Sequence, residues 1–345
     1  MPIPDLLQEL LTTPGPSGHE AEAAAVWRRA AEAFADVSSD ALGSSTARVK
    51  GTADGPALAI VGHIDEIGLA ITHVDDRGFL YFRGIGGWLP EVLLAQRVEV
   101  LTRDGRIPGV IGKKRGPFKK DKDEKIELKD LFIDVGARDG DDARSLVRIG
   151  DGVVLAPQPV ELRNNRAASR SWDNRVGCYI ALETARRVAE TGGAAGDVVA
   201  VAAIGEEVGD FAGARTTAYA LRPDVAIAVD VTWARDVPDA EREEMGDIRV
   251  AQGPTLVARR AAQRARVRPA LRDGRAGADP LRHRGRDGLD AHRCRRLSPQ
   301  PRGHSDGPGL DPDAVHPHAD GDRVAGRRRE RRASARRIRR ASRVG

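Results

Sequence analysis

VAVAAIGEEVGDFAGARTTAYALRPDVAIAVDVTWARD, residues 199–236, is the stretch that decides the fold class of this chain. Its first apolar run ends at Glu206 and Glu207, and its second apolar run ends at Asp230. Continuous runs of Val, Ile and Ala between turn residues are typical of strands buried on both faces of a parallel sheet. In open α/β sheets, ligands collect outside the carboxyl ends of such strands. We therefore predict that these three carboxylates meet in one place, where they need a cation or a retained proton.

A third strand end carries a histidine. The short apolar run 57–62 is followed directly by His63, and Asp65 comes two residues later. Imidazole is a frequent ligand of transition metals, and its second ring nitrogen needs an orienting partner. On its own, the His-x-Asp pair is a weak sign of a metal site, and ordinary hydrogen bonding explains it better.

A further carboxylate, Asp173, precedes an amphipathic helix that we expect to run to about Glu190. Each acid has a plain structural explanation when taken alone, because Asp173 and Asp230 could cap helices and the adjacent pair at 206–207 could form an exposed turn. Taken together, one histidine and three or four carboxylates at strand ends or helix starts form a ligand set for two divalent cations about 3.5–4 Å apart. One carboxylate would bridge the cations, and one glutamate of the adjacent pair could act as a general base.

The pattern of apolar residues, Gly and Pro along the chain changes twice. Helical spacing of leucines near the N-terminus, a Pro-Gly-Pro-Ser-Gly break and an Ala-rich helix precede the run at 57–62. Short alternating runs separated by Gly and Pro then indicate a small all-β domain, and α/β texture resumes at about residue 170. We predict an α/β fold with a mixed sheet flanked by helices, interrupted by a barrel-like β domain. The expected limits are a catalytic domain at 1–70 and 163–256, the β insert at 71–162, and a tail at 257–345.

Composition excludes several classes of protein. The chain has no apolar run long enough to span a membrane, and its N-terminus lacks the pattern of a signal peptide, so we expect a cytoplasmic protein. Two cysteines, Cys178 and Cys294, do not form a disulfide framework.

Several motifs resemble the family of co-catalytic metallo-aminopeptidases known as glutamyl or tetrahedral aminopeptidases. The resemblance covers about residues 1–256, and its motifs keep the family's order and spacing. They are GHIDEIG (62–68), GFLYFRGIGGW (78–88), GVIGKK (109–114), LFIDVGA (131–137), WDNRVGC (172–178), EEVG (206–209) and PDVAIAVDVTWARDVP (223–238).

The resemblance implies a role for each predicted site residue. As metal ligands it implies His63 and Asp230 for one cation, Asp173 as the bridge, and Glu207 for the second cation. As residues of the reaction it implies Glu206 as general base and Asp65 as the partner that orients the histidine. The implied cofactors are two divalent metal ions, zinc or cobalt.

The resemblance also implies partners. Peptides would be the substrates, losing their N-terminal residues, and the domain at 71–162 would build dimers and twelve-subunit tetrahedral shells. One departure from the family lies in the loop after EEVG, which reads DFAGA and is expected to alter the substrate pocket.

The resemblance ends where the composition changes. Residues 257–345 are rich in Arg and contain no Lys, Phe, Tyr, Trp, Asn, Thr or Met, whereas the preceding part is acidic on balance. A segment without bulky apolar groups cannot offset its ordering entropy, so we expect disorder there. The family's last metal ligand, a His in an Arg-Tyr-x-His segment, has no counterpart in this tail.

A shifted reading frame explains the tail. Permitted codons for residues 307–320, read one nucleotide later, can spell G-L-V-S-I-P-T-R-Y-I-H-T-P. Residues 290–298 can likewise spell T-H-T-D-A-D-A-F, and residues 257–271 can spell L-R-G-A-P-L-S-A-R-V-F-A-L-L. The three readings resemble the family's missing segments in the right order, so we infer a frameshift near residue 257.

The missing ligand makes the activity of the chain as written doubtful, and three other functions stay open. One is a related metal-dependent hydrolase of another small amide, and another is an inactive pseudoenzyme. The third is a nucleic-acid binder that uses the Arg tail, because basic segments attract phosphate. The acidic folded part and the absence of stacking aromatic residues from the tail argue against nucleic acid as a partner.

Overall fold

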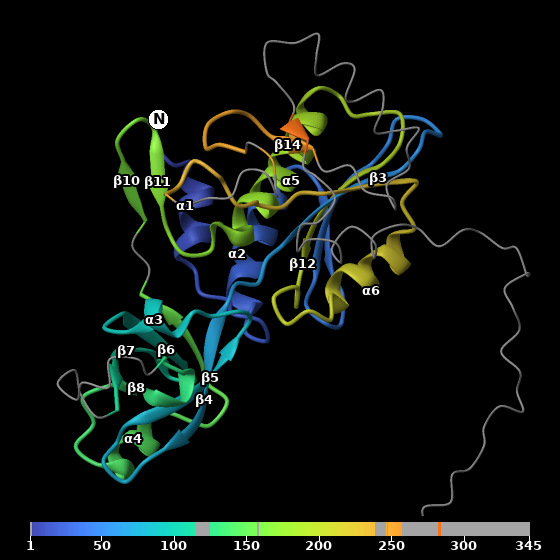
Figure 1. The fold of residues 1–345 in the computed structure, drawn as a ribbon. Coiled ribbons are helices and arrows are strands. Elements are labelled where there is room, and N and C mark those ends of the chain that lie inside the picture. Colours follow the sequence, from blue (N-terminus) through green and yellow to red (C-terminus); the bar gives the residue numbers. More distant parts are fainter. Residues whose placement is uncertain are drawn as a thin grey trace, which may run out of the picture. The chain divides into compact units, whose positions relative to one another are not determined.

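The structure is a computed structural model, and it describes residues 2–114, 125–156, 159–238, 246, 248–256 and 282–283 (Figure 1). The disorder predicted for the tail therefore concerns residues that, apart from 282–283, lie outside the described part of the chain.

The elements alternate between an α/β region and a β-rich region, as the sequence predicts. The helices are α1 (Asp5–Thr12), α2 (Ala21–Ala31), α3 (Pro90–Leu93), a 3-10 helix η1 (Leu128–Asp130), α4 (Gly140–Leu146), α5 (Trp172–Glu190) and α6 (Ala212–Leu221). The strands are β1 (Asp36–Ser39), β2 (Ser45–Val49), β3 (Leu58–His63), β4 (Gly68–Val74), β5 (Leu80–Ile85), β6 (Arg97–Thr102), β7 (Gly105–Lys113), β8 (Leu131–Asp134), β9 (Gly152–Leu155), β10 (Val160–Leu162), β11 (Arg166–Ala168), β12 (Val198–Ala203), β13 (Val225–Ala228), β14 (Thr255–Leu256) and β15 (Arg282–His283).

A mixed five-stranded sheet has the order β1-β2-β12-β3-β13. Strand β12 runs parallel to β3, with Ala203 opposite His63, and β13 pairs in parallel with the other side of β3. Strand β2 is antiparallel to β12. The three parallel strands therefore end at one edge of the sheet, and this edge is where their following residues gather.

Apolar side chains cover both faces of this sheet. On one face, the core contains residues of α1, α2 and α5 together with alternate residues of β2, β3 and β12. On the other face, the remaining residues of β3 and β12 pack against α6 (Figure 1). Every residue of β12 is buried, which confirms that its apolar run is a strand with two covered faces.

Strand β13 departs from the prediction of a buried strand. Its four residues are partly buried or exposed, and the side chain of Ile227 is 48% exposed. The physical reason is that, among the described strands, β13 pairs with β3 alone and has no neighbour on its other side.

The β-rich region closes into a barrel with the order β4-β5-β8-β7-β6-β9. Its interior is a separate apolar cluster that includes Leu69, Val100 and Ile133. The barrel confirms the predicted small β domain, and it also carries α3 and α4, two short helices that the alternating pattern did not indicate. The domain limits at 71 and 162 stay a prediction.

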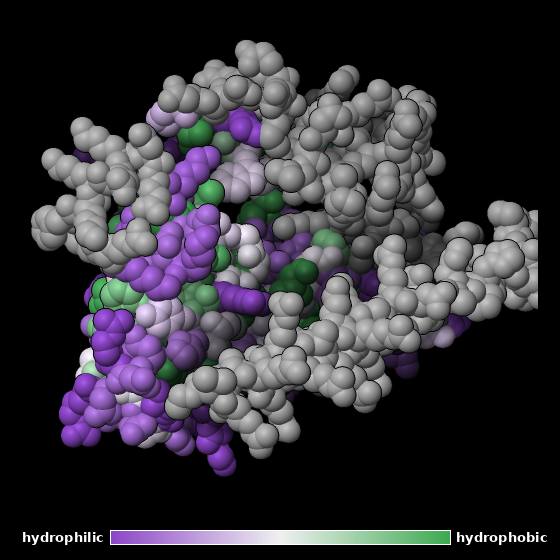
Figure 2. Space-filling view, turned by 60° about the horizontal axis from the view of Figure 1, so that its bottom comes forward, coloured by the Kyte–Doolittle hydropathy of each residue, from purple (hydrophilic) through white to green (hydrophobic). Residues whose placement is uncertain are grey.

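The described surface is mainly polar on the side shown in Figure 2, with smaller apolar areas between the hydrophilic side chains. Within the residues that the structure describes, no helix is both long and apolar enough to cross a membrane.

Candidate metal centre

The centre is built by the ends of the parallel strands. His63 is the last residue of β3, and the pair Glu206–Glu207 follows β12 after two residues, the second of which is Gly205, whose φ is +67°. The amide of Val229 donates to the carbonyl oxygen of Val61 at 2.8 Å, and this bond extends the pairing of β13 up to Asp230. The parallel register thus delivers side chains from three strands to one edge.

The first residues of α5 come close to the same edge. Gly62 lies against the backbone of α5, because a Cβ added there would be 2.4 Å from the nitrogen of Cys178. Asn174 donates from Nδ2 to the carbonyl oxygen of Val229 at 2.8 Å, and its Oδ1 accepts from the amide of Gly177 at 2.9 Å. These contacts tie the turn that carries Asp173 to the ends of β3 and β13.

His63 lies at the middle of the predicted site residues and is only 4% exposed. Its Nδ1 donates to the main-chain oxygen of Asp65 at 3.1 Å and is 3.4 Å from the Asp65 carboxylate. Its Nε2 is 3.0 Å from Oδ1 of Asp173, 3.6 Å from Oε2 of Glu206 and 3.9 Å from Oδ1 of Asp230. The ring therefore presents Nε2 to a group of carboxylates, while Asp65 contacts Nδ1 on the opposite side of the ring.

The sixth predicted residue, Glu207, completes a second set around the same histidine. His63, Asp173 and Glu207 place one ligand atom each within 4.8 Å of one another, and so do His63, Glu206 and Asp230. The backbone amide of Glu207 also donates to Oδ2 of Asp65 at 3.0 Å. The structure thus brings all six predicted residues together.

The charges of this group are strongly coupled. The pKa of Glu207 is raised to about 8, mainly by burial; His63 lowers it, while the neighbouring Asp173 and Glu206 contribute to the rise. Burial alone would lower the pKa of His63, but its hydrogen bonds with Asp173 and Asp65 raise that pKa well above the usual range. The carboxylates therefore carry more negative charge than one imidazole can offset.

These residues fit a divalent cation. An imidazole nitrogen and carboxylate oxygens form a donor set that suits Zn²⁺ and other first-row divalent metals. The ligand atoms are already gathered, and an added positive charge would offset the burial and the repulsion that together raise the pKa of Glu207.

Some residues that shape the centre carry no signal in the spacing of the motifs. Ser17, in the Pro-Gly-Pro-Ser-Gly break, donates to Oδ2 of Asp65 at 2.6 Å. Glu66 and Arg175 are fully buried, and they form an ion pair with 3.4 Å between Oε1 and Nη2. Both lie inside motifs of the sequence, GHIDEIG and WDNRVGC, where polar neighbours give no sign that these two charged side chains are buried.

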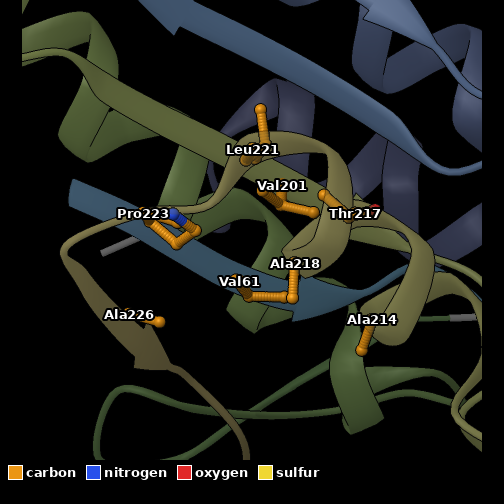
Figure 3. A pocket seen from close by; sticks show the side chains of 9 residues that line it. Val61, Val201, Ala214, Thr217, Ala218, Leu221, Pro223 and Ala226 are labelled. Atoms are coloured by element: carbon orange, nitrogen blue, oxygen red, sulfur yellow. The ribbon is translucent and has the colours of Figure 1, made fainter. Parts of the chain in front are cut away.

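An apolar pocket lies elsewhere, between α6 and the outer face of the sheet (Figure 3). Its lining consists of small or aliphatic side chains: Ala59, Val61, Val201, Ala214, Thr217, Ala218, Leu221, Pro223 and Ala226. None of the six predicted site residues lines it, and its lining contains no acidic, basic, histidine or cysteine side chain.

Several known proteins are similar to this chain in sequence. FrvX of Escherichia coli, which is named as an aminopeptidase, is 34% identical over 258 residues, which are 73% of this chain and 70% of FrvX. The lysyl aminopeptidase of Pyrococcus furiosus is 34% identical over 243 residues, 68% of each chain.

Solved structures show the same fold. The TET aminopeptidase of a marine sediment Thaumarchaeota archaeon has a TM-score of 0.78 and 32% identity, over 85% of this chain and 83% of that one. The TET1 peptidase of Pyrococcus horikoshii, described as assembling into a tetrahedron or a large octahedral shell, has a TM-score of 0.72 and 28% identity, over 82% and 84%. The sequence profile of the M42 glutamyl aminopeptidases matches residues 43–273. This chain belongs to the M42 glutamyl aminopeptidase family.

Proposed function

We propose that the chain is built to remove N-terminal residues from peptides with two divalent cations, zinc or cobalt, at the His63 centre. The observation that carries the proposal is the overlap of two ligand sets around one imidazole, His63 with Asp173 and Glu207, and His63 with Glu206 and Asp230. The family is metal-dependent and consists of aminopeptidases, which supports both the cofactor class and the reaction.

The ligands would divide between the two cations. His63 and Asp230 would hold one, Glu207 the other, and Asp173 would bridge them. Asp65 would keep the ring of His63 in place, since its main-chain oxygen accepts the Nδ1 proton. When bound, the cations polarise the scissile carbonyl and lower the pKa of water.

Glu206 would act as the general base. Its carboxylate is on the same edge of the sheet, with Oε2 3.6 Å from Nε2 of His63, and its side chain is 11% exposed. It would accept a proton from the attacking water and return it to the leaving amine. General bases of this kind contribute about 10²- to 10⁴-fold to rates.

The test measures release of N-terminal residues from unblocked peptides by the purified chain with Co²⁺ or Zn²⁺, beside the same peptides carrying an N-acyl group. We expect metal-dependent cleavage of unblocked peptides alone. Glu206→Gln should lower this rate at least 100-fold while cobalt still binds, and Glu161→Gln, an exposed glutamate distant in the sequence, should leave it unchanged. Preferential cleavage of acylated peptides would instead support the hydrolase of another small amide.

One observation favours low activity for this chain. Among the described residues, His63 is the single histidine in either ligand set. If the second cation needs another histidine, its site is incomplete here and that cation would bind weakly. The printed chain would then be much less active than its relatives.

Self-association is proposed from the relatives. Two solved structures of the same fold are described as a dodecamer and as a tetrahedral or octahedral shell. We propose that the barrel provides the contacts between copies, which size measurement of the purified protein would test.

A further inference from the structure

We propose that the buried cluster of Glu66, Arg170 and Arg175 is a positioning unit for the metal centre. It would hold the turn that carries Asp173 against the strand end that carries His63. The inference rests on the proposed function, because it assigns these residues a role in presenting ligands to a cation. None of the three belongs to either ligand set, so their action would be indirect.

The cluster joins the two segments that deliver the ligands. Glu66 comes three residues after His63 and is 2% exposed, and Arg175 comes two residues after Asp173 and is fully buried. Nη2 of Arg175 is 3.4 Å from Oε1 of Glu66. Arg170, on the other side of Asp173 in the sequence, donates from Nη1 to both oxygens of Glu66. One carboxylate thus binds arginines on either side of a proposed ligand.

The same arginines dock onto the end of α1. Nη1 of Arg175 donates to the carbonyl oxygens of Leu10 (2.8 Å) and Thr13 (3.1 Å), and Nη2 of Arg170 donates to that of Thr12 (2.8 Å). The last carbonyls of a helix have no partner within the helix and attract cations. The C-terminal end of α1 is therefore a fixed platform for both arginines.

The break after α1 holds the opposite segment. The amide of Gly15 donates to Oε1 of Glu66 at 3.0 Å, and the main chains of the two residues pair through a bond from Glu66 to the oxygen of Gly15 at 3.1 Å. Ser17 then bonds Asp65, which supports His63. The residues from 10 to 17 thus touch both ligand segments, and the ion pairs close the connection between them.

The energetics of buried ion pairs suit this role. Burying charges costs hydration, so such a cluster contributes little net stability compared with an apolar replacement, although it can fix one arrangement among several. The result of that fixed arrangement here is the 3.0 Å approach of His63 Nε2 to Asp173 Oδ1. Outer residues that orient metal ligands typically change metal affinity about 10- to 100-fold when they are replaced.

The experiment titrates the metal-free full chain with Co²⁺ and records affinity and the visible absorption of bound cobalt. The test variants are Arg175→Met and Arg170→Met. In each case the other arginine still pairs with Glu66, so no carboxylate is left without a cation. Arg29→Met is the matched control. It removes an exposed arginine that also pairs with α1, through Glu9, but that does not contact Glu66. All titrations are done below the unfolding temperature of each variant. A variant counts as folded when its circular dichroism spectrum matches that of the parent chain.

We expect both test variants to bind cobalt about 10- to 100-fold more weakly, with an altered absorption band. Arg175→Lys should recover part of the affinity, because it keeps the charge and a nitrogen that donates hydrogen bonds, and Arg29→Met should match the parent. Unchanged affinity and absorption in the folded test variants would overturn the inference and leave the proposed function standing. If Arg175→Met does not fold, Arg170→Met decides alone. If the parent chain does not bind cobalt, both the inference and the proposed function fail.

Discussion

At the scale of single residues, the site depends on carboxylates that lie close together and repel one another unless a cation is bound. Glu206 and Glu207 are adjacent in sequence, yet they belong to different ligand sets around His63. Their type and their place after β12 could be predicted from the sequence, because an apolar strand that ends in carboxylates directs them to the sheet edge. The buried partner Arg175 could not, because its contacts with Leu10 and Glu66 span more than a hundred residues of sequence.

The raised pKa of Glu207 makes a prediction for metal binding. With a pKa of about 8, Glu207 holds a proton at neutral pH in the metal-free protein, and the raised pKa of His63 favours the protonated ring. A cation must displace these protons, so affinity rises as pH increases toward 8, about tenfold per pH unit for each proton released. Calorimetric titration with Co²⁺ in buffers of different ionisation enthalpy counts the protons.

We expect release of one to two protons at pH 7 and a smaller number above pH 8. Glu207→Gln should remove one proton from the count, while Glu161→Gln should leave the count unchanged. Cobalt affinity that does not change between pH 6 and pH 8 would show that Glu207 is not a ligand.

At the scale of elements, the site depends on how closely α5 approaches the sheet. The apolar runs predicted β3 and β12 well, because strands covered on both faces need continuous apolar sequence. The same reasoning was wrong for β13, since burial depends on neighbours that the run itself does not specify. The two short barrel helices, α3 and α4, span four and seven residues, which is too short for a helical period to stand out.

A substitution at Gly62 tests whether the site needs the close contact between α5 and β3. A Cβ at this position would lie 2.4 Å from Cys178 N and 2.5 Å from Gly177 C, and both are backbone atoms that cannot rotate away. Gly62→Ala must push α5 from β3, with an expected loss of about 1–3 kcal/mol in the free energy of unfolding. Because Asp173 is at the start of α5, cobalt affinity should fall as well. Chemical denaturation and cobalt titration measure the two effects.

Gly87→Ala is the matched control, because an added Cβ there has no heavy atom within 4 Å. It should preserve both stability and cobalt affinity. A Gly62→Ala protein with the stability and affinity of the parent would mean that α5 tolerates the displacement, and the proposed coupling between helix and site would be wrong.

At the scale of the whole molecule, we propose one cause for the exposed side of β13 and for the Arg-rich tail. Strand β13 has a neighbour on only one side among the described strands, and the matching profile of the family ends at residue 273. The frameshift inferred near residue 257 would explain both features, because the sequence that completes the sheet would then be present in the gene in another frame. Permitted codons for residues 320–329, read one nucleotide later, can also spell T-E-T-V-S-L-D-D-V-E. This reading would replace a basic run by an acidic segment that includes apolar residues.

The last prediction follows from restoring that frame. The coding DNA, read one nucleotide later from about residue 257, should contain an Arg-Tyr-x-His segment, and sequencing decides this directly. A protein produced with the restored frame should bind two cobalt ions where the printed chain binds about one, because the added histidine completes the second ligand set. Its unfolding temperature should rise as new strands cover Ile227, and its aminopeptidase rate should exceed that of the printed chain at least 100-fold. A restored protein with the printed chain's cobalt stoichiometry and rate would place the cause of low activity within residues 1–256 instead.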